Sequence, residues 1–359
     1  MIRVLHIGMT SNKGGLESFI MNVYRNIDRS KIQFDFLALA DEKIAYEEEI
    51  KQFGGNVYHI LYRRSNLKRY NLSVLKFLKS KNYKIVHHHR THLGDLDYLW
   101  LSKFAGIENR ILHAHSTGYI TSLNIIAKFS ERINRILLNS VATKLLACGN
   151  QAGKWMFGDN KFEVVNNAIN INDFVFSNKL RTEIRSQYNI GQDKIVIGNV
   201  ASFFPVKNQQ FLIELLLKLD NNYMLCLIGD GPERKNIEKM VEENNLKDRV
   251  LFTGSISNVK DYYNIFDIFV LPSFFEGMPI VGVEAQTNGL QCIFSDKISK
   301  DIAITDNATF LSIESLDDWV RSINNSDGKR NLEIASIYEE GYDISSVTNQ
   351  ITNIYKSMS

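Results

Sequence analysis

The segment from Ile268 to Glu284 reads IFVLPSFFEGMPIVGVE and sets out a strand, a loop and a helix in turn. Four consecutive apolar residues predict a buried strand, and Pro272 and Gly277 mark the loop that follows it. Because proline is well tolerated in the first turn of a helix, we expect the helix to begin near Pro279. The segment therefore predicts one strand-loop-helix unit of an α/β fold.

The same segment holds two carboxylates, Glu276 in the loop and Glu284 inside the helix. The unpaired N–H groups at the helix start, between these two residues, favour an anion such as phosphate. Carboxylates are poor partners for a phosphate but good acceptors for the paired hydroxyls of a ribose or hexose ring. The segment therefore indicates a nucleotide sugar.

The strand-helix rhythm extends along the whole chain of 359 residues, a length that suits two domains. Amphipathic stretches such as Leu16 to Ile27 alternate with short apolar runs, which predicts parallel sheets covered by helices on both faces. The expected fold is α/β, with two Rossmann-like, doubly wound domains facing a central cleft. The predicted strands are Ile2–Ile7, Gln33–Leu39, Asn56–Leu61, Ile85–His88, Arg110–His113, Lys194–Val200, Tyr223–Ile228, Val250–Phe252, Ile268–Leu271 and Leu290–Phe294.

The polar, aperiodic stretch from Asn166 to Lys179 is the predicted linker. We expect an N-terminal domain over residues 1–168 and a C-terminal domain over residues 169–340. Residues 341–359 would form a C-terminal helix that crosses back to the first domain.

Composition narrows the classes of partner. Lys and Arg (42) nearly balance Asp and Glu (40), which argues against nucleic acid. The basic stretch from Arg63 to Lys81 is either a solvated face or a surface for peripheral binding to an anionic membrane. No apolar run is long enough to span a bilayer and the start reads as a strand, so we expect a cytoplasmic protein. Three isolated cysteines, Cys148, Cys226 and Cys292, are expected in the core, without disulfides or a thiolate metal site.

Two motifs in the first half carry candidate chemistry. Gly14 and Gly15 open a predicted helix, where the backbone can approach a phosphate or a sugar closely, although such a turn often only connects a strand to a helix. His87, His88 and His89 alternate between the faces of a strand, so we expect no metal there. His115, at the end of the next strand, would either bond a sugar hydroxyl or be satisfied at the sheet edge.

Three motifs in the second half follow predicted strands. Lys207 lies in a strand-to-helix loop, where it would neutralise a diphosphate unless it is an ordinary surface lysine. Gly229 and Ile256 belong to turns whose position suits the wall of a nucleotide pocket.

In this order, Gly-Gly-x-Glu, His-Ala-His-Ser, Lys-Asn, Gly-Asp-Gly-Pro and Pro-Ser-x-x-Glu-Gly-x-Pro resemble the retaining glycosyltransferases of family four over almost the whole chain. Glu276 and Glu284 match the E-x7-E motif of that family. The resemblance implies the GT-B architecture, with an acceptor-side first domain and a nucleotide-sugar-binding second domain. It also implies a diphosphate sugar donor, most commonly uridine-linked, and neither a cofactor nor a metal.

The resemblance also implies roles for individual residues. Glu276 would hold the donor sugar and Glu284 the ribose, while Gly15 and Lys207 would meet the diphosphate and His115 the sugar near the reacting carbon. The remaining implied donor-binding positions are Gly14, Ser202, Gly229, Ile256, Gly277, Met278, Pro279 and Ile280.

Two positions depart from the family pattern. Ser202 stands where an arginine is usual, which removes a cation beside the leaving diphosphate unless Arg90 or Arg110 compensates. The linker begins Val164-Val165-Asn166-Asn167 where the family commonly has Pro-Asn-Gly.

The sequence therefore predicts a retaining, metal-independent hexosyltransferase that acts on a hydroxyl of a polysaccharide precursor, as in capsule and exopolysaccharide assembly. A lipid-linked oligosaccharide is the expected acceptor. The alternatives are a noncatalytic partner of the same fold, which Ser202 favours, and a nucleotide-sugar epimerase. A glycoside hydrolase is less suitable because a helix start separates the carboxylates.

Overall fold

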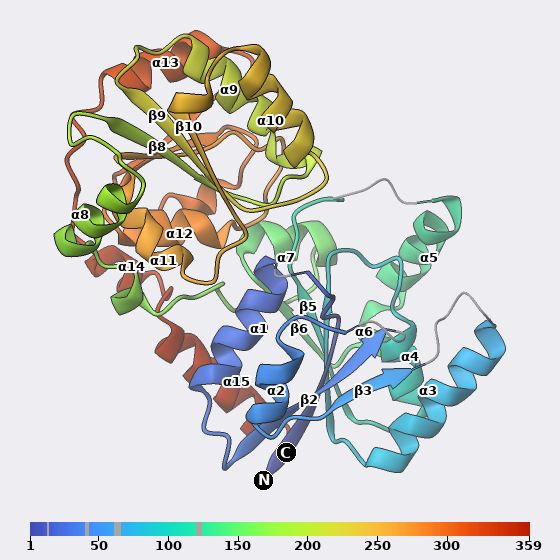
Figure 1. The fold of residues 1–359 in the computed structure, drawn as a ribbon. Coiled ribbons are helices and arrows are strands. Elements are labelled where there is room, and N and C mark those ends of the chain that lie inside the picture. The colour runs from blue at the N-terminus through green and yellow to red at the C-terminus, as the bar shows by residue number, and fades with distance from the viewer. Residues whose placement is uncertain (13, 40–42, 61–65, 120–123) are drawn as a thin grey trace. The chain divides into compact units, whose positions relative to one another are not determined.

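The computed structural model describes residues 1–359 except 13, 40–42, 61–65 and 120–123 (Figure 1). The chain divides into two compact units, residues 1–168 with 344–359, and residues 169–343. The predicted linker from Asn166 to Lys179 spans the point where the first unit passes into the second. No helix within the described ranges is both long and apolar enough to cross a membrane.

The first unit is built on a parallel sheet of seven strands in the order β3-β2-β1-β4-β5-β6-β7. Helices cover both faces of this sheet (Figure 1), and the strands that were predicted from apolar runs lie buried between them. The strands are β1 Ile2–Ile7, β2 Ile32–Leu39, β3 Val57–Ile60, β4 Ile85–Arg90, β5 Asn109–Ala114, β6 Lys144–Ala147 and β7 Glu163–Val164.

Asparagine side chains cap two helices of the first unit, with Asn66 accepting from Arg69 N and Asn124 from Ala127 N. The last helix of the chain, α15, packs beside α1 and adds Val347, Ile351 and Tyr355 to the core of this unit. The helices are α1 Gly15–Asn26, α2 Glu47–Gln52, α3 Leu67–Lys81, α4 Asp97–Phe104, α5 Ile125–Ile136, α6 Leu138–Val141, α7 Asn150–Phe157 and α15 Ile344–Ser357.

The second unit repeats the plan with six parallel strands in the order β10-β9-β8-β11-β12-β13. They are β8 Ile195–Val200, β9 Tyr223–Ile228, β10 Val250–Gly254, β11 Ile268–Leu271, β12 Gln291–Ser295 and β13 Ala308–Leu311. The α-helices are α8 Asn178–Gln187, α9 Gln209–Leu217, α10 Arg234–Glu243, α11 Val259–Tyr262, α12 Ile280–Thr287, α13 Leu316–Asn324 and α14 Ala335–Glu339. Short 3-10 turns are η1 Ile171–Asp173, η2 Pro205–Lys207, η3 Lys247–Arg249, η4 Tyr263–Ile265 and η5 Lys300–Ile302.

The fold class predicted from the sequence is confirmed, since both units are doubly wound α/β domains. The three cysteines are buried, as expected. Two parts of the prediction, Leu61 at the end of the third strand and Arg63 and Arg64 in the basic stretch, lie outside the described residues. The described part of that stretch lies mainly on α3, where Lys68, Lys76 and Lys79 are exposed.

Candidate active site

The order of the second sheet reverses direction between β8 and β11, because β9 and β10 extend to one side of β8 and β12 and β13 to the other side of β11. At such a switch point the loops beyond the carboxyl ends of the two strands diverge and leave room for a ligand. Lys207 follows β8 and Glu276 follows β11. Two of the predicted site residues therefore come from the two loops that flank this point.

Lys207 and Glu276 form an ion pair between Nζ and Oε1, although 69 residues separate them in the chain. The same carboxylate oxygen accepts a hydrogen bond of 3.0 Å from Ser273 Oγ. The lysine side chain is 21% exposed and the glutamate side chain 13%, so neither charge is fully solvated. Loss of either partner would leave the other charge partly buried without its counterion.

Backbone contacts hold the two loops together. Phe274 N donates to Val206 O over 2.9 Å, and Asn208 Nδ2 donates to Pro272 O over 3.2 Å. The loop after β8 is thereby fixed against the loop after β11. The position of the Lys207–Glu276 pair is set by these contacts as well as by its own attraction.

Helix α12 begins at Ile280, one residue after Pro279 and close to the predicted start. Its first-turn N–H groups follow directly on the loop that carries Glu276, as an anion site at a helix start requires. The Met278 side chain is buried, so only the backbone of that residue could face a ligand. Gly282 lets the helix approach the sheet, because a Cβ there would lie 2.9 Å from Ile302 Cγ1 and 3.1 Å from Phe294 Cζ.

Glu284 lies farther along α12, and its Oε2 accepts a hydrogen bond of 2.6 Å from Tyr263 Oη. Burial raises the pKa of the Glu284 carboxyl to about 7, and the tyrosine hydrogen bond partly opposes that rise. The carboxylate is therefore shared between ionised and neutral forms near neutral pH. Sequence reasoning assigned Glu284 but not Tyr263, since a tyrosine before a strand carries no distinctive signal.

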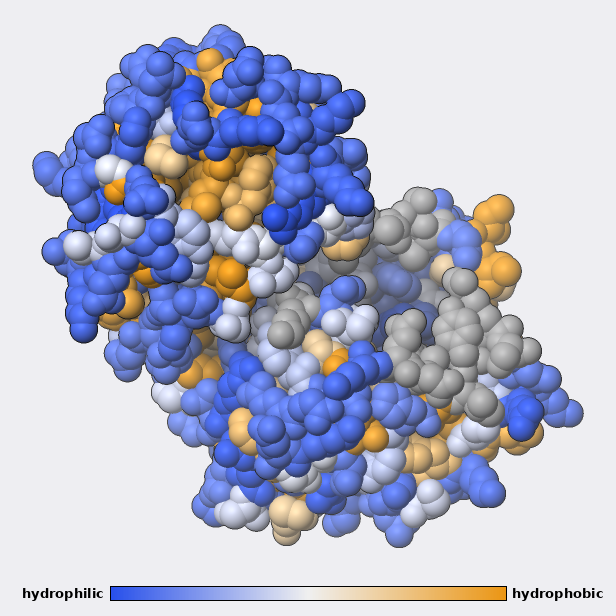
Figure 2. All heavy atoms as spheres, in the orientation of Figure 1, coloured by the Kyte–Doolittle hydropathy of each residue, from blue (hydrophilic) through white to orange (hydrophobic). Residues whose placement is uncertain are grey.

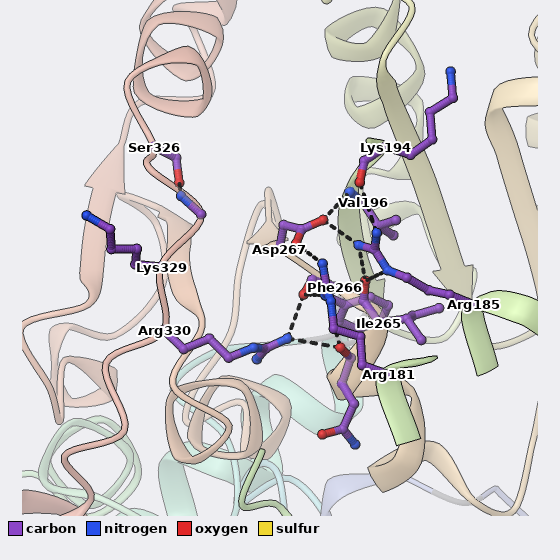
Figure 3. Close-up of polar contacts among 12 residues, drawn as sticks. Arg181, Arg185, Lys194, Val196, Ile265, Phe266, Asp267, Ser326, Lys329 and Arg330 are labelled. Atoms are coloured by element: carbon purple, nitrogen blue, oxygen red, sulfur yellow. Dashed lines mark hydrogen bonds and ion pairs between the residues drawn. The ribbon is translucent and has the colours of Figure 1, made fainter. Parts of the chain in front are cut away.

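A cluster of three arginines fixes the segment that carries Tyr263 (Figure 3). The Arg330 guanidinium donates to the carbonyl oxygens of Tyr263, Asn264 and Phe266 over 3.2, 3.1 and 2.6 Å. Arg181 and Arg185 of α8 each pair with Asp267 at 2.6 Å. These contacts leave the Tyr263 hydroxyl held against Glu284.

The other predicted positions of the second unit are spread along the sheet edge. Gly229 follows β9 at a φ of 134°, and a Cβ there would lie 2.0 Å from Ala201 O, so the loop packing requires glycine. Ser202 is the exposed neighbour of Ala201. Ile256 follows β10, which is three strands away from β11 in the sheet. The structure thus gathers Lys207 and Glu276, while Ile256 stands apart from them.

Both arginines that were considered as replacements for the missing cation already have partners in the first unit. Arg90 pairs with Asp95 at 3.0 Å. Arg110 lies near the start of β5, at the opposite sheet edge from His115, and its guanidinium donates to Val141 O over 2.7 Å and Glu108 O over 3.0 Å. The Arg110 guanidinium is therefore already used at the amino end of the strand.

In the first unit, Glu17 shapes the glycine loop between β1 and α1. Its carboxylate accepts from Thr10 N, Thr10 Oγ1 and Gly14 N over 3.0, 2.8 and 3.1 Å. A Cβ at Gly15 would meet no atom within 4 Å among the described residues, so the backbone there has an open side. Glu17 was part of the sequence motif without a role, and an acid in the first turn of a helix is the signal that could have revealed one.

His115 belongs to a cluster of five histidines on one sheet face, which we call the imidazole array. The register sets His6 opposite His87, and His89 opposite His113. As predicted, strand alternation puts His88 on the other face and His113 on the same face as His115. The array consists of His6, His87, His89, His113 and His115.

Hydrogen bonds run through the whole array. His115 Nε2 bonds His89 Nδ1 at 2.9 Å, and His89 Nε2 bonds His6 Nδ1 at 3.0 Å. Tyr355 Oη, from α15, bonds His87 Nδ1 at 2.6 Å and His6 Nε2 at 3.4 Å. His87 Nε2 in turn bonds His113 Nδ1 at 3.2 Å. Burial lowers the pKa of His6 and His115 to about 3, so these rings are neutral at neutral pH.

Comparison with known proteins identifies the family. Residues 181–325, which contain Lys207, Glu276 and Glu284, match the family described as Glycosyl transferases group 1. The chain is 33% identical over 369 residues to the putative glycosyltransferase EpsF of Bacillus subtilis, covering 98% of this chain and 96% of the relative. The chain belongs to the group 1 glycosyltransferases. This glycosyltransferase is also 26% identical to the capsular polysaccharide biosynthesis glycosyltransferase CapH of Staphylococcus aureus, over 82% of each chain.

Solved structures agree with the fold. This glycosyltransferase superposes on Anabaena HepE in complex with UDP-glucose with a TM-score of 0.80 and 17% identity, over 99% of this chain and 100% of the other. The TM-score is 0.72 against WaaG, a glycosyltransferase involved in lipopolysaccharide biosynthesis, at 17% identity and 98% and 99% coverage. The predicted GT-B architecture is confirmed.

Proposed function

We propose that this glycosyltransferase is a retaining enzyme of family four that moves a hexose from a UDP-sugar to a hydroxyl of a lipid-linked polysaccharide precursor. The observation that carries the proposal is the Lys207–Glu276 ion pair at the switch point of the second sheet, beside the first turn of α12. An anion site, a cation and two hydroxyl-binding carboxylates in one loop-helix unit suit a diphosphate sugar.

The proposed step is a front-face displacement. The acceptor oxygen forms a bond to the anomeric carbon while the bond from that carbon to the donor phosphate oxygen breaks, and the acceptor proton passes to the departing diphosphate. Glu276 holds sugar hydroxyls as positive charge develops on the ring, and Lys207 balances the leaving charge. Glu284 holds the ribose, and Tyr263 orients its carboxylate.

The remaining site assignments are part of the proposal. Gly14 and Gly15 would approach the diphosphate, and His115 would touch the donor sugar. Backbone groups from Gly277 to Ile280 would bind sugar and phosphate oxygens, and Ser202, Gly229 and Ile256 would line the nucleotide side. We propose that no cofactor or metal takes part in transfer.

Named relatives support the donor and the acceptor. HepE was solved with UDP-glucose, at 17% identity. An Escherichia coli relative, 23% identical over 80% of this chain, is a UDP-Gal:alpha-D-GlcNAc-diphosphoundecaprenol alpha-1,3-galactosyltransferase. A donor bound through uridine diphosphate and an acceptor on a lipid diphosphate are therefore the first to test.

A donor panel tests the proposal against its alternatives. The protein is incubated with UDP-, GDP- and ADP-sugars, with and without lipid-linked acceptor, and with excess chelator in a parallel series. We expect slow hydrolysis of one UDP-sugar, faster transfer when acceptor is present, and no loss with chelator. Binding without turnover would instead support the noncatalytic partner that Ser202 favours, and conversion of one UDP-sugar into another would support an epimerase.

A peripheral position at the cytoplasmic face of a membrane is also part of the proposal, and α5 is the surface that supports it. Ile125, Ile126 and Ile136 leave 86%, 77% and 82% of their area exposed, and Phe129 leaves 65%. Two polar residues of the helix face inward, since Asn134 accepts from Trp100 Nε1 and Glu131 from Tyr119 Oη. Helix α5 therefore presents its apolar side to solvent, and Figure 2 shows the hydrophobic side chains gathered there.

Charge points to an anionic bilayer as the partner of α5. Lys128 and Arg132 are exposed next to the apolar side. An apolar helix face bordered by basic residues suits the headgroup region of a membrane that contains acidic lipids. This surface replaces the basic stretch from Arg63 to Lys81 as the proposed membrane contact, because the described part of that stretch shows exposed charge with less apolar area.

Vesicle pelleting tests α5 without any need for transfer. We expect wild-type protein to pellet with phosphatidylcholine vesicles that contain phosphatidylglycerol, and more weakly with phosphatidylcholine alone. The double variant Ile126→Ser with Phe129→Ser should not pellet, whereas Leu332→Ser, at an exposed leucine of the second unit, should pellet like the wild type. Equal pelleting of all three proteins would refute the assignment.

A further inference from the structure

Of the imidazole array, only His115 has a role in the proposed transfer reaction, and the other four histidines are left unexplained. Five neutral imidazoles occupy a face of the sheet that aliphatic side chains would fill at lower cost, because every buried ring nitrogen needs a partner. Two ring nitrogens of the array have none among the described residues, Nε2 of His113 and Nδ1 of His115. His113 is fully buried, so its orphaned nitrogen is costly.

One arrangement of protons around Tyr355 leaves two nitrogens of the array with a free lone pair. A hydroxyl oxygen can accept two hydrogen bonds, and Tyr355 Oη has His87 Nδ1 and His6 Nε2 as its partners. If both histidines donate to it, His6 Nδ1 must accept from His89 Nε2, and His87 Nε2 must accept from His113 Nδ1. His89 Nδ1 and His113 Nε2 are then left as bare lone pairs.

Those lone pairs meet a third imidazole. His89 Nδ1 lies 2.9 Å from His115 Nε2, which gives His115 a nitrogen to offer once its proton moves to the unpartnered Nδ1. One ring nitrogen from each of His89, His113 and His115 lies within 4.8 Å of the other two. Ligand atoms around a tetrahedral zinc ion lie about 3.3 Å apart, as follows from Zn–N bonds of about 2.0–2.1 Å.

We propose that His89, His113 and His115 form a binding site for Zn²⁺, with a fourth position open to water. Neutral imidazole is the form that zinc binds. His115 is partly exposed and provides access for the ion. His6, His87 and Tyr355 act as the outer shell, because their hydrogen bonds orient two of the ligands.

The site has a consequence that rests on the proposed function. Zinc bound at His115 Nε2 would leave the ring proton on Nδ1, so that Nδ1 could no longer accept a hydrogen bond from a hydroxyl of the donor sugar. Bound Zn²⁺ is therefore expected to inhibit transfer, and a chelator to restore it, while the metal-free enzyme is the active form. Metal binding itself is measured without transfer, so the two proposals can fail separately.

Metal counting tests the site. Protein stripped with a chelator is dialysed against Zn²⁺ and analysed by elemental mass spectrometry, and Co²⁺ titration is followed by visible absorption. We expect one ion per chain and the absorption bands of four-coordinate Co²⁺. The matched control is His59→Ala, which removes a histidine of the same unit outside the array and should retain the ion.

Three variants locate the ion. His115→Ala and His113→Phe should lose it, and Tyr355→Phe should weaken binding by about 10–100-fold, because it removes an outer-shell hydrogen bond while keeping the ring. Circular dichroism of each metal-free variant shows whether it folds, and His115→Ala, at the partly exposed end, decides the matter if His113→Phe does not. Failure of wild-type protein to bind more Zn²⁺ than His115→Ala would overturn the proposal, as would equal loss in His59→Ala.

Discussion

The carboxyl edge of the second sheet carries opposite charges in its loops, whereas the first sheet carries neutral imidazoles on its buried face. Lys207 and Glu276 keep partial access to solvent, so their charges remain available to a diphosphate sugar. The imidazoles bond one another within the core, except at His113 Nε2 and His115 Nδ1, and stay uncharged. Two domains of one architecture thus use polar residues in opposite ways, one for charge and one for neutral lone pairs.

The two units differ most clearly in their content of histidine. All eight histidines precede residue 116, so the second unit has none. Tests of activity therefore change carboxylates of the second unit. Tests of acid stability compare the two units, since only the first contains histidine.

The largest expected effect is on turnover. Glu276→Gln should lower kcat by at least about 100-fold, because a carboxylate that orients the charged transition state becomes a neutral amide. Nucleotide binding should change little, since the change lies on the sugar side. Initial rates and UDP calorimetry measure the two effects, and Glu314→Gln, a change outside the site, is the control. Retention of full turnover would remove Glu276 from the proposed role.

Acid should unfold the first unit before the second. Burial holds the pKa of His6 and His88 near 3, whereas the same groups titrate near 6.5 when exposed. Between these values the unfolded chain binds more protons than the folded one, so the free energy of unfolding falls as pH falls from about 6.5. Hydrogen exchange at pH 7 and pH 5, compared between the units, measures this. Equal sensitivity in both units would contradict the expectation.

Gly15→Val probes the open side of the glycine loop. The new side chain meets no described atom within 4 Å of its Cβ, so folding should be preserved. If the donor diphosphate approaches here, KM for the donor should rise by about 10-fold or more, in keeping with a blocked contact. Thermal melting checks the fold and initial rates check KM. An unchanged KM would leave Gly15 as a structural connection only.

The smallest expected effect couples binding to stability at Glu284. Its folded pKa near 7 exceeds the ordinary value of 4.5, so the carboxyl costs stability above about pH 4.5, and the cost is complete above pH 7. Glu284→Gln removes that charge and should raise the melting temperature by a few degrees at pH 8, but little at pH 5. UDP affinity should fall by about 10-fold through loss of a charged acceptor. Calorimetry and melting curves at both pH values test the pair of effects.

Local sequence was sufficient for much of the fold. The strands Ile2–Ile7, Tyr223–Ile228 and Ile268–Leu271 have the predicted bounds, because apolar residues dominate each of them and Arg3 and His6 are the only exceptions. Strands β6, β7 and β13 were not predicted. Strand β7 has only two residues, and β13 has no fully buried position. Their place in the sheet comes from pairing with a neighbour, which local pattern does not encode.

The sequence predicted which site residues follow the ends of strands. Lys207 and Glu276 were each expected in a loop at the sheet edge, but their contact depends on β8 pairing with β11 across 69 residues. The imidazole array depends in the same way on the register of β1, β4 and β5. Alternation along β4 showed correctly that three consecutive histidines cannot converge, but it could not show that neighbouring strands supply the missing rings.

Helix α15 ties the first unit to the last residues of the chain. Val347, Ile351 and Tyr355 of this helix fill the core of the first unit, and Gln350 Nε2 donates to Val164 O over 2.9 Å. During synthesis the second unit can emerge and fold while the first still lacks this helix. A chain whose synthesis ended before residue 344 would therefore lack α15. Its first unit, although made first, would be incomplete, and its imidazoles and apolar core would be open to chaperones and proteases.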